Sequence, residues 1–399
     1  MLTRTFSLYK NAYGGLSRNT WWLAVVMAVN RSGTMVVPFM SMYLTQHIGV
    51  SIGKAGFVMS MFGIGAIIGA LIGGRLTDKI GYYYIQITTL ITGGIMFIVL
   101  GQLQSYPAIC VGTFILALVN EAFRPANSVA VAHYSKEENR TRSYSLNRLA
   151  INLGWGIGGG LGGFIASYNY QLLFWVDGLT NISAAILLYI MLSPSRNVAT
   201  EIKIAGPKVK RNSPYKDKTY LLFIAMVFLF AMCFFQLFTT VPVFYKEKFH
   251  LPVYFIGIVM AMNGLIIAAI EMVTIFKLEG RRPLLHFISV GVVLVGVSYL
   301  MLTVRALNFE LLAICVMLLL TIGEILSMPF MNSFWISRTE QLNRGQYAAL
   351  YTVAWASAQA VGPLTGSLIA ENYGYNVLWI ITGSTCIALS VFYRQLHHR

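Results

Sequence analysis

Charged residues are scarce in this sequence. Only 11% of its 399 residues are Asp, Glu, Lys or Arg, whereas 57% are hydrophobic and the mean hydropathy is +0.67. A soluble globular protein carries about 25% charged residues, so the composition excludes that class. Apolar runs long enough to cross a bilayer as a helix, about 20 residues each, recur along the chain. We predict an all-α integral membrane protein with twelve spans: 21–45, 55–76, 85–103, 107–132, 145–167, 172–192, 220–244, 253–276, 284–304, 311–334, 347–370 and 377–393.

Acidic residues are scarcer than basic ones, 14 against 29, and the formal net charge is +15. If both termini are cytoplasmic, 22 of the 29 Lys and Arg fall at the cytoplasmic side, in the first twenty residues, the even-numbered loops, the central linker and the tail. This asymmetry is the positive-inside bias that orients membrane proteins. The basic surplus therefore predicts topology and not nucleic-acid binding, and the short loops favour an inner (plasma) membrane.

Cysteine and histidine are also rare. The four cysteines all lie inside predicted spans and the six histidines lie in loops or at span ends, which predicts neither a disulfide framework nor a metal cluster. The first span is too long for the apolar part of a cleavable signal peptide. The sequence shows no nucleophile–base pair, so we expect no cofactor and no enzyme activity.

The chain contains an internal repeat. Residues 56–63 (GFVMSMFG) resemble 257–264 (GIVMAMNG), and 158–166 (GGGLGGFIA) resemble 362–370 (GPLTGSLIA), at offsets of 201 and 204. Such duplication is typical of transporters, whose site lies between the repeats. The predicted domains are a first six-helix bundle at 1–192, a basic cytoplasmic linker at 193–219, and a second six-helix bundle at 220–399.

This organisation resembles the major facilitator superfamily over essentially the whole chain. The family motif G-x-L-A-D-R-x-G-R-R appears here as GRLTDKIGYY, with Gly74, Asp78 and Gly81 in matching positions. The resemblance implies that Asp78 locks the inner gate. Arg124 is a candidate partner of Asp78, with a cavity cation and a snorkelling side chain as the alternatives.

A second motif resembles the multidrug:proton antiporter, or drug-efflux, branch. Its signature G-x-x-x-G-P-x-x-G-G corresponds to GWGIGGGLGG at 154–163, with Gly159 in the proline position, and the repeat copy keeps Gly362 and Pro363. The small residues Gly154, Gly158 and Gly162 recur every four positions, which predicts a face for close helix packing. The resemblance implies two pseudo-symmetric bundles, alternating access, and a monomer.

Three ionisable residues lie deep within predicted spans, where charge is costly and therefore a functional candidate. At about 1.5 Å per residue, Arg31 lies near the midplane, and Glu121 and Glu324 lie at nearly equal depth in the two repeats. In the superfamily the spans concerned line one central cavity, so we expect the three charges around one chamber. Glu324, buried and unpaired, is the preferred proton-coupling carboxylate; Glu121 is the second candidate, unless it forms a fixed ion pair with Arg31.

Three further charges have structural interpretations. Glu271 is expected to pair with Lys277 near the inner interface, Arg148 to act as an inner anchor, and Asp177 to be a shallow cap or a wetted group.

Aromatic residues supply candidate substrate contacts. Phe234 and Phe238 share a helical stripe near Gln236, and the first span offers Phe39 and Tyr43. Such side chains accommodate varied apolar ligands, although helix packing is the common alternative.

Three functions are compatible with these residues. The favoured hypothesis is proton-coupled export of amphipathic small molecules. The second is proton-coupled symport of small anionic, zwitterionic or peptide-like solutes held by Arg31. The third is a membrane receptor or scaffold that does not transport.

Overall fold

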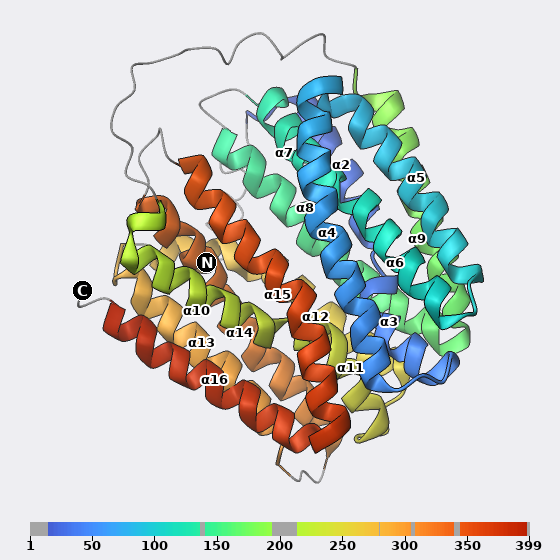
Figure 1. Ribbon diagram of the computed structural model, residues 1–399. Helices are drawn as coiled ribbons and strands as arrows, with labels where there is room; N and C mark the ends of the chain where they lie inside the picture. Colours follow the sequence, from blue (N-terminus) through green and yellow to red (C-terminus); the bar gives the residue numbers. More distant parts are fainter. Residues whose placement is uncertain are drawn as a thin grey trace, which may run out of the picture.

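In the computed structural model, residues 15–135, 140–193, 214–278, 280–304, 308–338 and 344–396 are described, and every regular element among them is helical. Eleven of the helical spans are long and apolar enough to cross a membrane, and α15 (Arg344–Tyr373) is a twelfth long helix. The predicted all-α, twelve-helix fold is therefore confirmed (Figure 1).

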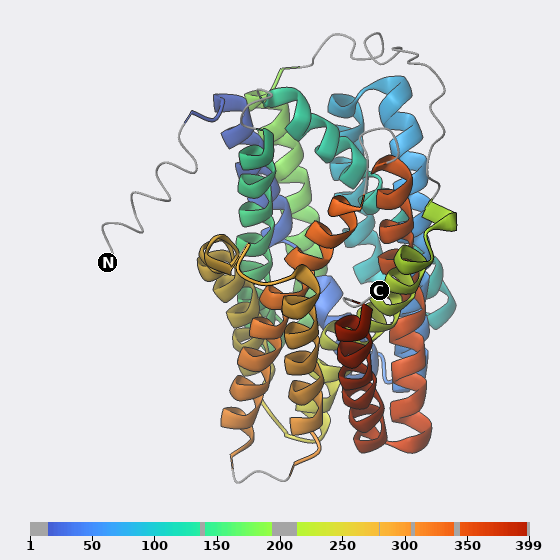
Figure 2. The ribbon, with the colours of Figure 1, turned by 90° about the vertical axis from the view of Figure 1, so that its left-hand side faces the viewer.

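The helices of each half follow one another in up-and-down order (Figure 2). The first half holds α2 (Arg18–Ser32), α3 (Val36–Met42), a π-helical turn η1 (Tyr43–His47), α4 (Ile52–Ile80), α5 (Tyr82–Gln102), α6 (Tyr106–Glu121), α7 (Phe123–Tyr134), α8 (Arg140–Tyr168) and α9 (Tyr170–Met191). The second half holds a short 3₁₀ turn η3 (Pro214–Lys216), α10 (Lys218–Phe234), α11 (Gln236–Glu247), α12 (Val253–Leu278), α13 (Leu284–Met301), α14 (Phe309–Ser337), α15 and α16 (Tyr375–Leu396).

Two of the spans in the first half are interrupted close to a proline. Pro38 cannot donate a hydrogen bond to the carbonyl of Thr34, and the first span breaks there into α2 and α3. Pro125 likewise leaves the carbonyl of Glu121 without a helical partner, and the fourth span breaks into α6 and α7 at Ala122. Such breaks are tolerated in a membrane only where other groups satisfy the freed backbone.

Asp177 of α9 satisfies the break in the first span. Its carboxylate accepts hydrogen bonds from the backbone N–H of Met35, at 3.0 Å, and of Val36, at 2.8 Å. Asp177 was expected to be a shallow cap or a wetted group: it is a helix cap, but it is fully buried and not wetted. The reason is that its partner is the free N-terminus of α3, which lies inside the protein and attracts negative charge.

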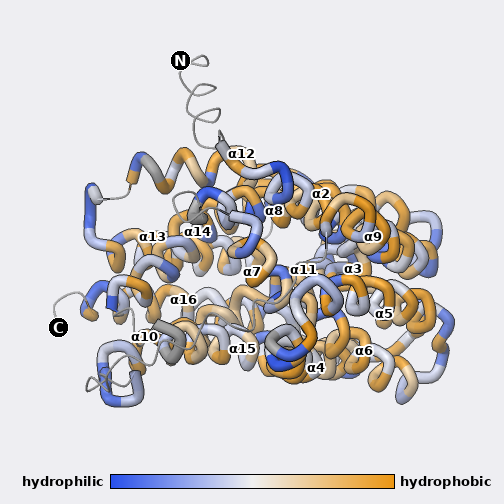
Figure 3. The backbone as a smooth tube through the Cα atoms, turned by 90° about the horizontal axis from the view of Figure 1, so that it is seen from above, coloured by the Kyte–Doolittle hydropathy of each residue, from blue (hydrophilic) through white to orange (hydrophobic). Residues whose placement is uncertain are grey.

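The two halves lie side by side, as the view along the helices shows (Figure 3). We call the end at which α9 ends and α10 begins the linker face, and the opposite end the far face. One seam between the halves joins α8 to α12, where an added Cβ at Gly163 would come within 2.4 Å of the Cα of Gly257. Gly154, Gly158 and Gly162 lie on another face of α8, against α2 and α3 of its own half. Glycine on two faces lets α8 approach both neighbours closely.

The second seam joins α4 to α15. The Ser60 hydroxyl donates to the carbonyl of Ala360, and an added Cβ at Gly63 would meet the backbone of Ala360 at 2.4 Å. Closer to the far face, Gly53 lies against Glu371. Figure 1 shows the two helices side by side near the far face and diverging toward the linker face. The structure is therefore closed at the far face.

Candidate transport site

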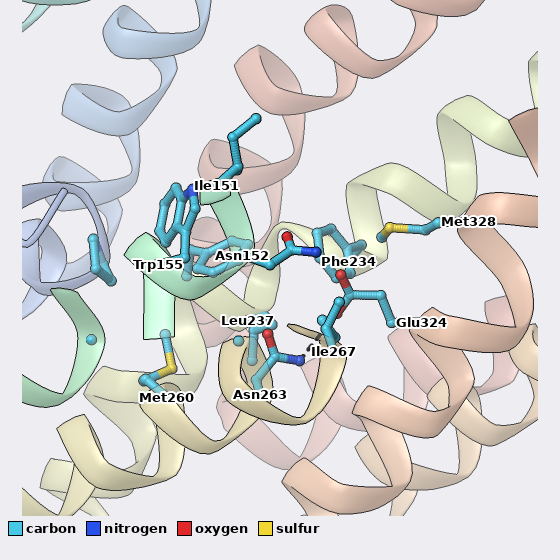
Figure 4. A pocket seen from close by; sticks show the side chains of 14 residues that line it. Ile151, Asn152, Trp155, Phe234, Leu237, Met260, Asn263, Ile267, Glu324 and Met328 are labelled. Carbon is cyan, nitrogen blue, oxygen red and sulfur yellow. Dashed lines mark hydrogen bonds between the residues drawn. The ribbon is translucent and has the colours of Figure 1, made fainter. Parts of the chain in front are cut away.

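A cavity of about 180 Å³ lies between the two halves (Figure 4). Five of the spans contribute to its wall. The lining residues are Pro38, Ile151, Asn152, Trp155, Gly159, Phe234, Leu237, Phe238, Met260, Asn263, Gly264, Ile267, Glu324 and Met328. Of these fourteen described residues, Glu324 alone carries an ionisable side chain, so the cavity joins one carboxylate to a largely apolar and aromatic surface.

Glu324 enters the cavity from α14. Its Oε2 accepts a hydrogen bond from Asn263 Nδ2 at 3.1 Å, and the same nitrogen donates to Thr321 Oγ1 at 3.0 Å. Figure 4 shows Asn152, from α8, and Asn263, from α12, on two sides of the carboxylate. No cation pairs with Glu324 among the described residues, which leaves its charge available to a proton or to a cationic ligand.

The aromatic wall crosses the boundary between the halves. The ring of Trp155 on α8 lies 5.5 Å from that of Phe238 on α11, and Phe238 lies 5.6 Å from Phe234. Met260 and Met328 add flexible, polarisable surface. Phe234 and Phe238 were predicted here; Asn152, Trp155 and the methionines were not. The signal for Asn152 and Asn263 was a polar amide inside an otherwise apolar run.

An ion pair lies on the same α8–α12 seam, closer to the linker face. Arg148 Nη2 is 3.0 Å from Glu271 Oε2, and the exposed fraction of the side chain is 41% for Arg148 and 6% for Glu271. Asn263, Ile267 and Glu271 lie at successive turns on one face of α12. The Arg148–Glu271 ion pair therefore continues the cavity wall. The predicted pairing of Glu271 with Lys277 is wrong, because Glu271 faces the other half of the chain.

Arg31 and Glu121 line a separate, smaller pocket inside the first half, of about 30 Å³. It shares no lining residue with the cavity that holds Glu324. The expectation that all three charges surround one chamber is therefore wrong. The face of the helix was not foreseen: Arg31 turns its Cβ toward Gly154 of α8, within its own half.

Glu121 pairs with a neighbour on its own span. Its Oε2 is 3.1 Å from Arg124 Nη2, across the α6–α7 break. The alternative of a fixed Glu121–Arg31 ion pair is not what the structure shows. Arg124 has 62% of its side chain exposed.

Three predicted substrate contacts lie away from the cavity between the halves. Phe39 is buried against Gly162 of α8, and Tyr43 stacks near the far face on His47 and Phe174. Gln236 donates from Nε2 to the carbonyl of Gly362 at 2.8 Å, and its Oε1 accepts from Thr240. These bonds saturate the amide and tie the α10–α11 break to α15.

The predicted inner-gate residues lie toward the linker face. Gly81, with a φ of 99°, caps α4 and makes the turn into α5, and Gly74 has open space where a Cβ would be. The side chain of Asp78 lies outside the described part of the chain, so its pairing with Arg124 stays a prediction. Pro363 of the α15 motif lies at the α4–α15 seam, with its carbonyl 2.8 Å from an added Cβ at Gly56.

Comparison with known proteins agrees with this architecture. The model of the Major Facilitator Superfamily matches residues 21–363. The chain belongs to that superfamily. It is therefore a membrane transporter of small molecules with several spans.

Individual relatives are distant. The chain is 23% identical to a Na(+), Li(+), K(+)/H(+) antiporter of Planococcus maritimus, with 93% of each chain covered. It is 24% identical to Multidrug resistance protein 2 of Bacillus subtilis, over 67% of this chain and 69% of that one. A solved peptide transporter POT shares the fold with a TM-score of 0.81 at 15% identity, covering 97% of this chain and 96% of the other. The drug-efflux resemblance is thus supported by named relatives.

Proposed function

We propose that the protein is a proton-coupled antiporter that exports amphipathic, preferentially cationic organic molecules. The observation that carries the proposal is the composition of the cavity between the halves: one carboxylate, Glu324, in an aromatic and methionine-rich wall. The wall offers adaptable apolar surface to the body of such a molecule. The carboxylate offers a counter-charge that either a proton or an organic cation can satisfy.

Competition for Glu324 accounts for the coupling. If the termini are cytoplasmic, the linker face is the inner side, and the closed far face makes this an inward-facing conformation. Ionised Glu324 binds the cationic substrate from the cytoplasm, and the two halves then rock about the site and expose it outside. A proton from the outer side replaces the substrate on the carboxylate, and the protonated carrier returns to release the proton inside.

Symport of anionic or peptide-like solutes has less support. It relied on Arg31 in the cavity, but the Arg31 guanidinium lies in the other pocket, and no cationic residue is among those that line the cavity. Glu121 stays a secondary candidate for proton binding, because it lines the pocket inside the first half. A non-transporting receptor predicts no movement of substrate at all.

Exchange of inorganic monovalent cations for protons is a second candidate. One relative bears that name, and the carboxylate of Glu324 together with the amide oxygens of Asn152 and Asn263 would be oxygen ligands for such an ion. The apolar remainder of the wall would have no role in the exchange of inorganic cations, so we rank this function second.

Purified protein in vesicles with an imposed pH gradient tests the proposal. We expect an organic cation such as a lipophilic ammonium to move opposite to protons, measured with a pH-sensitive dye inside. Glu324→Gln should abolish coupled proton movement. Glu310→Gln, on the exposed first turn of the same helix, is the matched control and should leave it intact. Proton movement driven only by Na⁺ or K⁺ would favour the second candidate, and unchanged coupling in Glu324→Gln would refute the assignment of Glu324.

A further inference from the structure

The pocket inside the first half contains a buried positive charge with no counter-charge of its own. The Arg31 side chain is largely covered by protein, and its Nε has neither solvent access nor a hydrogen-bond partner in the described part of the chain. The accessible part of the Arg31 side chain faces the pocket that this residue lines. Taking a guanidinium out of water without a paired anion costs several kcal/mol. A stable fold therefore requires something in the pocket that balances the charge.

Glu121 is the nearest candidate from the chain, but its charge is already engaged. The ion pair with Arg124 holds Glu121 Oε2 at 3.1 Å. Two cations, Arg31 and Arg124, thus share one carboxylate, and the surroundings of the pocket keep one net positive charge. Asp177 is not available either, because its carboxylate caps the N-terminus of α3.

The pocket also offers neutral hydrogen-bond donors. The side chains of Asn120 and Thr34 line it, and neither makes a hydrogen bond to another described residue. Asn30 and Asn181 also line the pocket, and Asn30 Nδ2 donates to Asn181 Oδ1 at 2.9 Å, so this pair satisfies part of its own hydrogen-bonding capacity. The other lining residues are apolar or aromatic: Val37, Phe62, Leu90, Phe97 and Phe123. At about 30 Å³ against 180 Å³, the pocket is much smaller than the cavity of the proposed substrate and has room only for a small ion or a water molecule.

We propose that this pocket binds a small monovalent inorganic anion, such as chloride, between the Arg31 guanidinium and the side chains of Asn120 and Thr34. The anion balances Arg31 and lets Glu121 remain with Arg124. The site is separate from the cavity between the halves. The inference is therefore independent of the proposed transport reaction and stands or fails on binding alone.

Chloride titration of thermal unfolding tests the site. Purified wild-type protein in detergent is unfolded at increasing chloride concentrations, with gluconate replacing chloride at constant ionic strength. Binding to the folded state stabilises it by RT ln(1 + c/Kd), where c is the free chloride concentration. We therefore expect a concentration-dependent rise in the unfolding temperature of roughly 2 °C or more. Arg31→Gln should remove the chloride response. Arg394→Gln, the same change at an exposed position near the end of α16, is the matched control and should retain it.

Two further variants should change the half-saturating chloride concentration in opposite directions. They test the proposal even if Arg31→Gln does not fold. Glu121→Gln removes a negative charge from the pocket wall and should lower the half-saturating chloride concentration, by roughly threefold or more. Arg124→Gln frees Glu121 to pair with Arg31 and should raise that concentration. An identical chloride response in all variants, or none in the wild type, would overturn the proposal. Loss of the response in Glu121→Gln would overturn it too, because the carboxylate would then be part of the ligand set.

Discussion

A single added methyl group on the α8–α12 seam should change which side of the transporter is open. Gly163→Ala would place a Cβ 2.4 Å from Gly257 Cα and 2.8 Å from its N, whereas ordinary van der Waals contact begins near 3.4 Å. The two backbones would therefore have to separate by about 1 Å. Overpacking of this kind costs about 1–3 kcal/mol. This contact is part of the conformation that is closed at the far face, so the added methyl group raises the free energy of that conformation. The population should shift away from it by roughly 5–150-fold.

Distances between spin labels can measure the shift. Labels at Lys54 and Asn372, exposed positions on α4 and α15 at the far face, report opening there. The exposed Cys315 is replaced first, and the other three cysteines are buried. We expect Gly163→Ala to lengthen this distance. Gly162→Ala is the matched control, because its Cβ would press on Phe39 and Met35 within the same half. An unchanged distance in Gly163→Ala, or an equal change in both variants, would refute the reasoning.

Two other changes test contacts that hold the structure together. Arg148→Gln leaves Glu271 buried and unpaired and should lower the free energy of unfolding by about 1–2 kcal/mol. The loss is smaller than for a fully buried pair because Arg148 is partly exposed. Adding Glu271→Gln should recover most of that loss, whereas additive effects of the two substitutions would show that the pair contributes nothing. Asp177→Asn replaces one of the two oxygens that accept hydrogen bonds from Met35 and Val36, and should lower the free energy of unfolding by about 1–3 kcal/mol. Asn308→Ala, which removes an exposed helix cap on α14, is the comparison and should lower it by only about 1 kcal/mol in the same thermal unfolding measurement.

Span number and depth could be predicted from the sequence because each depends on local properties. An apolar run of sufficient length specifies a crossing. The depth of Glu324 likewise follows from counting residues at a fixed rise. These features need no knowledge of what lies beside the helix. Proline does not by itself specify a break, because the first and fourth spans break near Pro38 and Pro125, whereas α14 and α15 continue through Pro329 and Pro363.

Helix rotation could not be predicted in this way. Arg31 and Glu324 lie at comparable depth, yet they face different cavities, because the orientation of each helix is set by tertiary packing against its neighbours. Gly154, which admits the Cβ of Arg31, lies more than a hundred residues away in the chain. The same limit explains Gln236, whose amide is saturated by backbone and threonine partners that only the fold brings together.

The two seams between the halves are unequal, and this inequality suggests where the cavity opens. Contacts on the α8–α12 seam run from Gly163 near the far face to the Arg148–Glu271 pair toward the linker face. Contacts on the α4–α15 seam are found at Gly53, Gly56, Ser60 and Gly63, all in the half of α4 closer to the far face. Beyond Gly63, three glycines of α4 pack on α6 and Ala122 of their own half instead: Gly65, Gly69 and Gly73. We therefore propose that the α8–α12 seam is the hinge side and that substrate would reach Glu324 from the linker face, between α4 and α15.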